Sequence, residues 1–217
     1  MLKSHKHVFW EAFFVTILIF GLGVFIGVVL ENMRAKKVFD MYSDSDLNLL
    51  DIRVQAQILD LKDLNCKDAI EKNIEFGDRV YEDAKLIDRY ELANEITDYI
   101  ISEHKKNDLL RAIFWINSIK IKEKCGKIFH TVVYLYNYKP ENLDQKEKQK
   151  VFSRYLEEMK SKYGNEIVLI PLAINMDLLS IDLLAKNYNV SDTSIIVDES
   201  LIVKDINDIS LVEKKIR

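Results

Sequence analysis

A run of nineteen residues without a charge, from 12 to 30, constrains this chain more than any other feature of its sequence. At about 1.5 Å of helical rise per residue the run would reach roughly 28 Å, close to the hydrocarbon thickness of a bilayer. Trp10 lies at one end of the run, where an amphipathic ring favours the headgroup layer. The run therefore predicts a membrane-spanning helix, with the lipid bilayer as its surroundings.

A cleaved signal peptide is the main alternative for an apolar run near an N-terminus. Its apolar region would have only about 7–15 residues and would end in a small-residue cleavage site. The run here is longer, and it leads into Glu31 and Arg34 with no such pattern. We therefore expect residues 1–33 to form a short tail and a retained anchor.

Gly23 and Gly27 have the GxxxG spacing within this run. Small residues at that spacing let two helix backbones approach closely in lipid, so the pair could form a homodimer contact. Glycine is also simply common in membrane helices. The sequence leaves both interpretations open.

The orientation of the anchor is set by the basic residues that flank it. Lys3 and Lys6 precede the run, and Arg34, Lys36 and Lys37 follow it, so the two flanks are nearly balanced. We expect a single-pass protein of the cell membrane whose large part lies on the extracytoplasmic side.

Residues 34–127 are charged and patterned as a helical region. The 31 basic and 35 acidic residues of the chain are interspersed, and no basic stripe suggests a nucleic-acid partner. Ser43 or Ser45 is predicted to cap a first helix, in which apolar residues recur at spacings of three and four. These apolar residues are Leu47, Leu50, Val54, Ile58 and Leu61.

Three more helices are predicted in this region. Asn65 is a candidate N-cap for the second, and the third is expected from about Glu91 to Glu103. Asn107 would cap the fourth, which Gly126 would end at the position after its last turn.

Residues 128–217 have a different pattern, in which β-branched and aromatic runs alternate with helical ones. The runs "IFHTVVYLYNY" and "EIVLIPLAINM" predict two buried strands, and "TSIIVD" with "LIVK" predicts a hairpin. The predicted order β-α-β-α-β-β-α implies a parallel pair of strands that meets the hairpin. The fold class is therefore α/β, with a membrane helix and a helical region before the sheet.

This element order, together with the run "NYNV….SIIVDESLIV", resembles the thioredoxin-like fold. The resemblance implies that the second strand lies at a sheet edge, where Pro171 is tolerated. Thioredoxin-like enzymes carry C-x-x-C after the first strand and a cis-proline before the hairpin. The first place here reads Tyr138-Lys139-Pro140-Glu141-Asn142, and the second reads Thr193-Ser194. We therefore expect no catalytic residue and no cofactor in this domain.

The two cysteines of the chain lie before this domain. Cys66 is in the first turn of a predicted helix, and Cys125 is at the end of another. They could form a disulfide if residues 91–125 run back antiparallel to the helix that Cys66 begins, or they could serve as a distant redox pair. Two buried, unpaired thiols are the other interpretation.

The histidines do not form a metal-binding set in the sequence. His104 lies beside Lys105 and Lys106 and is expected on a solvated face, while His130 falls in a buried strand. His130 is expected to be a core residue with satisfied hydrogen bonds, so no metal site is predicted.

A domain with this fold and no thiol chemistry could still act through its surface, by binding another molecule. In the resembled fold the loop after the first strand and the turn before the hairpin meet at one edge. Tyr136, Tyr138, Pro140 and Thr193 would line a shallow binding patch there, unless this edge packs on the helical region of the same chain.

We therefore expect a membrane-anchored, non-catalytic binding or assembly module with a protein partner. Two alternatives stay open at this stage. One is a membrane-bound thiol oxidoreductase or redox chaperone that uses Cys66 and Cys125. The other is a structural subunit of a larger membrane complex.

Overall fold

The computed structural model describes residues 5–61, 63–92 and 98–217. The chain divides into two compact units, Met1–Asp46 and Leu47–Arg217, which are described separately.

The first unit consists of the first part of helix α1 (His5–Ile58). Within it, Val8–Met33 has a mean hydropathy of 2.8 and no buried residue, so by length and composition this segment could cross a membrane. Space is open around Gly23 and Gly27, because a Cβ built on either would meet nothing within 4 Å. The prediction that Ser43 or Ser45 begins a helix is wrong, because α1 continues through both residues.

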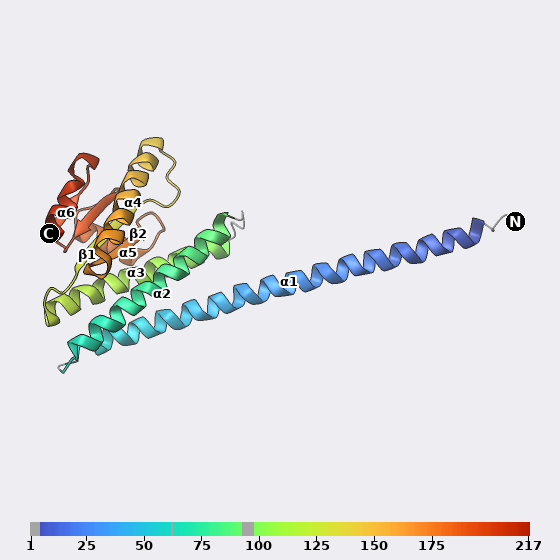
Figure 1. Cartoon of the computed structure of the whole chain (residues 1–217), viewed down its shortest axis with the longest axis horizontal. Coiled ribbons are helices and arrows are strands. Elements are labelled where there is room, and N and C mark those ends of the chain that lie inside the picture. Colours follow the sequence, from blue (N-terminus) through green and yellow to red (C-terminus); the bar gives the residue numbers. More distant parts are fainter. Residues whose placement is uncertain (1–4, 62, 93–97) are drawn as a thin grey trace. The chain divides into compact units, whose positions relative to one another are not determined.

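The second unit begins with the end of α1 and two long helices, α2 (Cys66–Leu92) and α3 (Asp98–Cys125), which lie side by side (Figure 1). Asn65 caps α2 as predicted, since its side-chain oxygen accepts from the backbone N–H of Lys67 at 3.1 Å. Gly126 follows α3 with a φ of 88°, the left-handed conformation that favours glycine after a helix.

The prediction of two helices between residues 91 and 125 is wrong. Asn107 does not cap a helix but lies buried inside α3, where its side chain donates to the backbone carbonyl of Val80 at 3.2 Å. A buried partner on α2 thus satisfies the amide that sequence reasoning placed at a helix end. Glu91 belongs to α2, which extends to Leu92.

A four-stranded sheet follows, with the strand order β2-β1-β3-β4. Strand β1 pairs parallel with β2 and antiparallel with β3, which pairs antiparallel with β4. The pairings predicted for the first two strands and for the hairpin are confirmed, and Pro171 does lie in an edge strand. The strands are β1 (His130–Tyr136), β2 (Ile167–Ala173), β3 (Ser194–Val197) and β4 (Leu201–Val203).

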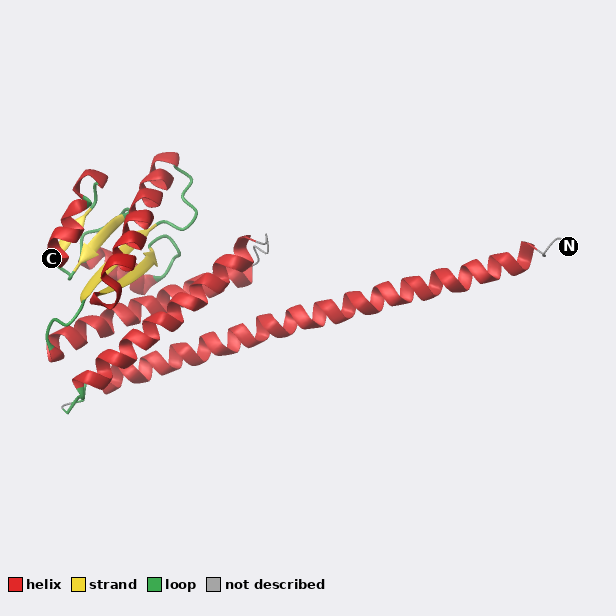
Figure 2. Ribbon diagram, in the orientation of Figure 1, coloured by secondary structure: helices red, strands yellow, loops and turns green. Residues whose placement is uncertain are grey.

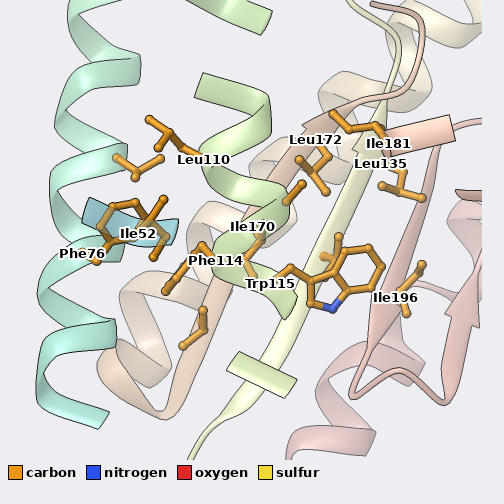
Figure 3. Packing of buried hydrophobic residues seen from close by; sticks show 14 of the residues in the cluster. Ile52, Phe76, Leu110, Phe114, Trp115, Leu135, Ile170, Leu172, Ile181 and Ile196 are labelled. Atoms are coloured by element: carbon orange, nitrogen blue, oxygen red, sulfur yellow. The ribbon is translucent and has the colours of Figure 1, made fainter. Parts of the chain in front are cut away.

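Helices cover both faces of this sheet (Figure 2). Along β1, Val133 and Leu135 belong to one core cluster, which α3 and α5 complete (Figure 3). Val132 and Tyr134 belong to another cluster, which α4 and α6 complete. The helices are α4 (Leu143–Tyr163), α5 (Leu179–Asn187) and α6 (Ser210–Ile216), with short 3-10 turns at Gly164–Glu166 and Ile206–Asp208.

The segment of α1 that belongs to this unit is packed on one face only. Ile52 and Leu59 are buried in the cluster with α2 and α3. The apolar residues predicted from their spacing lie on the other side and are exposed. We call them the outer stripe: Leu47 (62% exposed), Leu50 (57%), Val54 (54%) and Ile58 (47%) of α1, and Leu61 (60%) in the turn after it.

Candidate functional site

A groove of about 840 Å³ runs along the edge strand β2, between α2 on one side and α4 on the other. Ile74, Gly77 and Phe114 form apolar wall on the side of α2 and α3, and Leu169 and Pro171 of β2 lie opposite. Charged side chains of both signs surround the groove. They include Asp78, Asp88, Arg111, Lys150, Glu157 and Lys160.

The backbone of β2 that borders this groove is only partly satisfied. The N–H of Ile174 donates to Tyr136 at 2.8 Å, so in this parallel ladder the alternate residues direct their backbone groups away from β1. Lys160 donates to the carbonyl of Ile167 at 2.9 Å, and Pro171 has no N–H. Among the described residues, none outside the sheet bonds the backbone of Leu169 between them. Among these residues, Leu169 is therefore the position whose backbone N–H and carbonyl can pair with another chain.

One end of the groove holds a buried polar group. The carboxylate of Asp108 lies 3.6 Å from Arg111 and accepts from the backbone N–H of Ala173 at 3.4 Å. Burial raises the pKa of Asp108 to about 6, although Arg111 and the Ala173 bond act in the opposite direction. Burial also raises the pKa of Tyr136, which hydrogen-bonds with Arg111.

Next to this group lie three side chains that could bind a metal ion. The possible ligand atoms of Asp88, Glu91 and His104 all lie within 4.8 Å of one another. Oxygen and imidazole nitrogen ligands suit a divalent transition metal such as zinc. Sequence reasoning missed this group, because only the pairing of α2 with α3 brings His104 to the two carboxylates.

The same three side chains also bond without a metal. Glu91 accepts from Lys139 at 2.7 Å and from Tyr138 at 3.0 Å, and its other oxygen lies 2.9 Å from Nε2 of His104. Burial opposes the charge of Glu91, but these bonds outweigh it and lower the pKa of its carboxyl. The expectation that His104 lies on a solvated face is wrong, since its side chain is 14% exposed. A network of ion pairs is thus sufficient to explain the cluster.

The residues predicted to form a binding patch are divided by the structure. Tyr136 lines the groove, whereas Tyr138 bonds Glu91 and so packs on the helical region of the same chain. Thr193 is 0% exposed and accepts from Gln149 of α4 at 3.1 Å, so it lies inside the fold and lines no surface patch. Pro140 is half-buried in the loop after β1.

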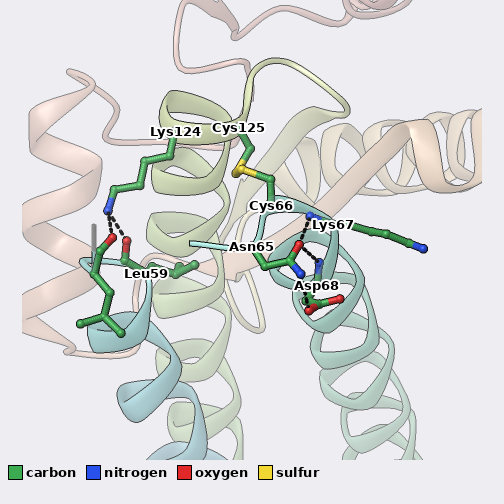
Figure 4. Close-up of a disulfide and its surroundings, with 8 residues drawn as sticks. Leu59, Asn65, Cys66, Lys67, Asp68, Lys124 and Cys125 are labelled. Carbon is green, nitrogen blue, oxygen red and sulfur yellow. Dashed lines mark hydrogen bonds between the residues drawn. A yellow bond between two sulfur atoms is a disulfide. The ribbon is translucent and has the colours of Figure 1, made fainter. Parts of the chain in front are cut away.

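Cys66 and Cys125 are joined in a disulfide (Figure 4). The bond links the first residue of α2 to the last residue of α3 and so fixes one end of this antiparallel pair. Lys124 strengthens the same end, because its ammonium donates to the backbone carbonyls of Leu59 and Leu61.

A second buried polar cluster ties the β3–β4 turn to α3. Lys122 lies 3.1 Å from Asp198 and 2.7 Å from Glu199, and it donates to Thr131 at 2.6 Å. Nδ1 of His130 lies 2.6 Å from Asp198, so the expected hydrogen bond is present. The side chain of His130 is 29% exposed, so the expectation that it lies in the core is wrong. Burial opposes the charge of Asp198, but the bonds from His130 and Lys122 outweigh it and lower its pKa.

Comparison of this chain with protein-family models, with curated proteins and with solved structures finds no match. The groove and its surroundings are therefore the basis for a functional conclusion.

Proposed function

We propose that this protein is a membrane-anchored binding module that receives an extended segment of another polypeptide in the groove beside β2. The observation that carries the proposal is the free backbone at Leu169, which faces a groove of about 840 Å³. An extended segment can add to such an edge as a further strand, with main-chain hydrogen bonds for affinity and pockets for alternate side chains.

The chemistry of the groove supports a polypeptide as the ligand. Apolar side chains such as Ile74 and Leu169 would accept apolar side chains of the segment. Lys150 and Glu157, on α4, offer charges of opposite sign at the rim. Edge strands are commonly blocked against pairing, and here Lys160 and Pro171 block the positions on either side of Leu169 in part.

The sheet supports the proposal that residues 128–217 have a thioredoxin-like fold. Its support is the parallel pairing of β1 with β2, followed by an antiparallel hairpin at β3 and β4. Under this proposal the domain has the thioredoxin-like fold without its thiol motif. The loop around Pro140 occupies the place that C-x-x-C has in the thioredoxin-like enzymes.

The disulfide supports an extracytoplasmic position for the large unit. Disulfides persist in oxidising compartments and are rare in the cytosol. With Val8–Met33 as a retained anchor, the Cys66–Cys125 bond favours an N-terminus inside and a groove outside. The redox alternative would require this bond to open and close in use, and the helix pair that it closes instead suits a structural disulfide.

A photo-crosslinker tests the groove directly. The full chain in membranes would carry p-benzoylphenylalanine at Leu169, or at Leu183 as the control, an exposed apolar position on α5 outside the groove. We expect adducts at Leu169 that mass spectrometry maps to one extended segment of another protein. Adducts of equal yield at both positions, or none at Leu169, would contradict the proposed function.

A further inference from the structure

The cluster of Asp88, Glu91 and His104 lies at the end of the helix pair that is opposite to the disulfide. Glu91 is the last residue but one of α2, and His104 is in the second turn of α3. Asp88 precedes Glu91 by three positions, so the two carboxylates lie on one face of α2. The pairing of the two helices brings this face to His104.

The spacing of the three side chains suits a single metal ion. Nε2 of His104 lies 2.9 Å from Oε2 of Glu91, and the possible ligand atoms of all three residues are within 4.8 Å of one another. Ligand atoms about 2.1 Å from a tetrahedral zinc ion are about 3.4 Å apart. Asp88 is exposed, so its side chain can rotate through the small distance that remains.

Asp88 takes no part in the ion pairs that hold Glu91 and His104. In the described part of the chain no donor bonds its carboxylate, although the side chain lines the groove together with His104. Two carboxylates at this separation repel each other, and a cation between them would remove that cost. The ion-pair network holds the cluster together without a metal, but it does not explain Asp88.

Tyr138 positions the other two candidate ligands. Its hydroxyl donates to Oε1 of Glu91 at 3.0 Å, and Oε2 is the oxygen that faces His104. Its ring packs on the ring of His104, with 4.8 Å between the centroids. Outer partners of this kind orient the ligands of metal sites. The ammonium of Lys139 also lies 2.7 Å from Glu91, but its side chain is 45% exposed and can move into solvent when an ion binds.

We propose that Asp88, Glu91 and His104 bind a divalent transition-metal ion of the zinc class, with water in the remaining position. Oxygen ligands alone would suit magnesium or calcium, and the imidazole of His104 shifts the preference to zinc. The ion would fix the end of α2 and α3 that the disulfide leaves open. This site is independent of the ligand proposed for the groove.

Titration of the purified full chain with Zn²⁺ in detergent tests the site. The chain is first treated with a chelator, and no reductant is added, so the bonded cysteines offer no thiolate. His5 and His7 could bind zinc themselves, so a His5→Gln/His7→Gln chain is the parent of every variant. By calorimetry we expect one Zn²⁺ per chain, bound at least about tenfold more tightly than Mg²⁺.

Asp88→Asn is the sharpest variant, because it removes a candidate ligand and no hydrogen bond within the described chain. It should weaken Zn²⁺ binding at least about tenfold and leave the Tm of the metal-free protein unchanged. Glu82→Gln removes an exposed carboxylate from the same helix and should bind Zn²⁺ as the parent does. His104→Gln should also lose binding, whereas His130→Gln, which removes a histidine bonded to another carboxylate, should keep it.

Thermal unfolding gives a second measurement. Zn²⁺ should raise the Tm of the parent and not that of Asp88→Asn, because an ion that binds only the folded state stabilises it. Absence of Zn²⁺ binding to the parent, binding that survives both Asp88→Asn and His104→Gln, or equal affinity for Mg²⁺ would overturn the inference.

Discussion

The ring of Phe114 lies against Gly77, so that a Cβ built on this glycine would be 2.6 Å from Cζ of the ring. The contact brings α2 and α3 together beside the groove. It also explains a glycine inside a long helix, where this residue costs about 1 kcal/mol relative to alanine.

Gly77→Ala should therefore destabilise the protein, although alanine is the better helix former. Displacing the ring of a packed Phe114 is expected to cost about 1–3 kcal/mol, partly offset by the gain in helix propensity. The measurement is denaturant unfolding of the chain in detergent. In a Phe114→Leu background the same substitution should become neutral or stabilising, and an equal loss in both backgrounds would contradict the role of the contact.

Removing the disulfide should lower stability without changing the fold. The bond spans 59 positions of the sequence. In the chain-entropy model, a loop of that size contributes about 4 kcal/mol. Cys66→Ser/Cys125→Ser should lower the unfolding free energy by that order, with an unchanged circular dichroism spectrum. If thiol reductant lowers the stability of the native chain and not of this variant, the effect belongs to this bond.

Asp108 should make stability fall as the pH rises. Its pKa is raised from 3.8 to about 6, so the folded chain holds the proton more tightly than the unfolded chain does. Asp108 does not lower the unfolding free energy below about pH 4, where it is protonated in both states. The unfolding free energy falls between pH 4 and 6, and the full cost of ionising the buried carboxyl is reached above pH 6. A shift of this size corresponds to a cost on the order of 3 kcal/mol.

Asp108→Asn removes this titration and keeps an acceptor for Ala173. Unfolding free energies should be measured at pH 4, 5, 6 and 7. The stability of the variant should rise relative to that of the native chain as the pH rises. Glu141→Gln, in an exposed loop, controls for the loss of one negative charge. A constant difference between Asp108→Asn and the native chain would be inconsistent with a titrating Asp108.

Lys122→Met should be among the most damaging single changes in the chain. It leaves Asp198 and Glu199 without their buried cation, and breaking a buried ion pair in this way costs about 3–5 kcal/mol. Lys120→Met is the matched control on the same helix. Lys120 pairs with the exposed Asp60, so its loss should cost less than about 1 kcal/mol. Thermal unfolding of the two variants makes the comparison, and similar losses would mean that the Lys122 cluster adds no stability.

The membrane topology is tested with intact cells or spheroplasts. The protein should stay in the pellet after an alkaline carbonate wash, because a helix with nineteen successive uncharged residues is long enough to span the bilayer core. Protease added from outside should remove the large unit. Full protection until lysis would place the groove in the cytoplasm and reverse the proposed orientation.

The sequence determined the features that depend on neighbouring residues. The uncharged run, the cap at Asn65 and the turn at Gly126 follow from local hydrogen bonding and from the period of the apolar residues. The parallel pairing of β1 with β2 follows from the order of strands and helices along the chain. The placement of Pro171 at an edge is of the same kind, because proline cannot donate to a ladder.

Only the tertiary structure decided which surfaces are covered. The spacing of Leu47 and Val54 shows that one helical face is apolar, yet α2 and α3 pack on the face of Ile52 instead. Asn107 has the chemistry of a cap, and a partner on α2 makes it a buried interior residue. Burial and long-range partners depend on residues far away in the chain, so the periodicity of a single segment cannot specify them.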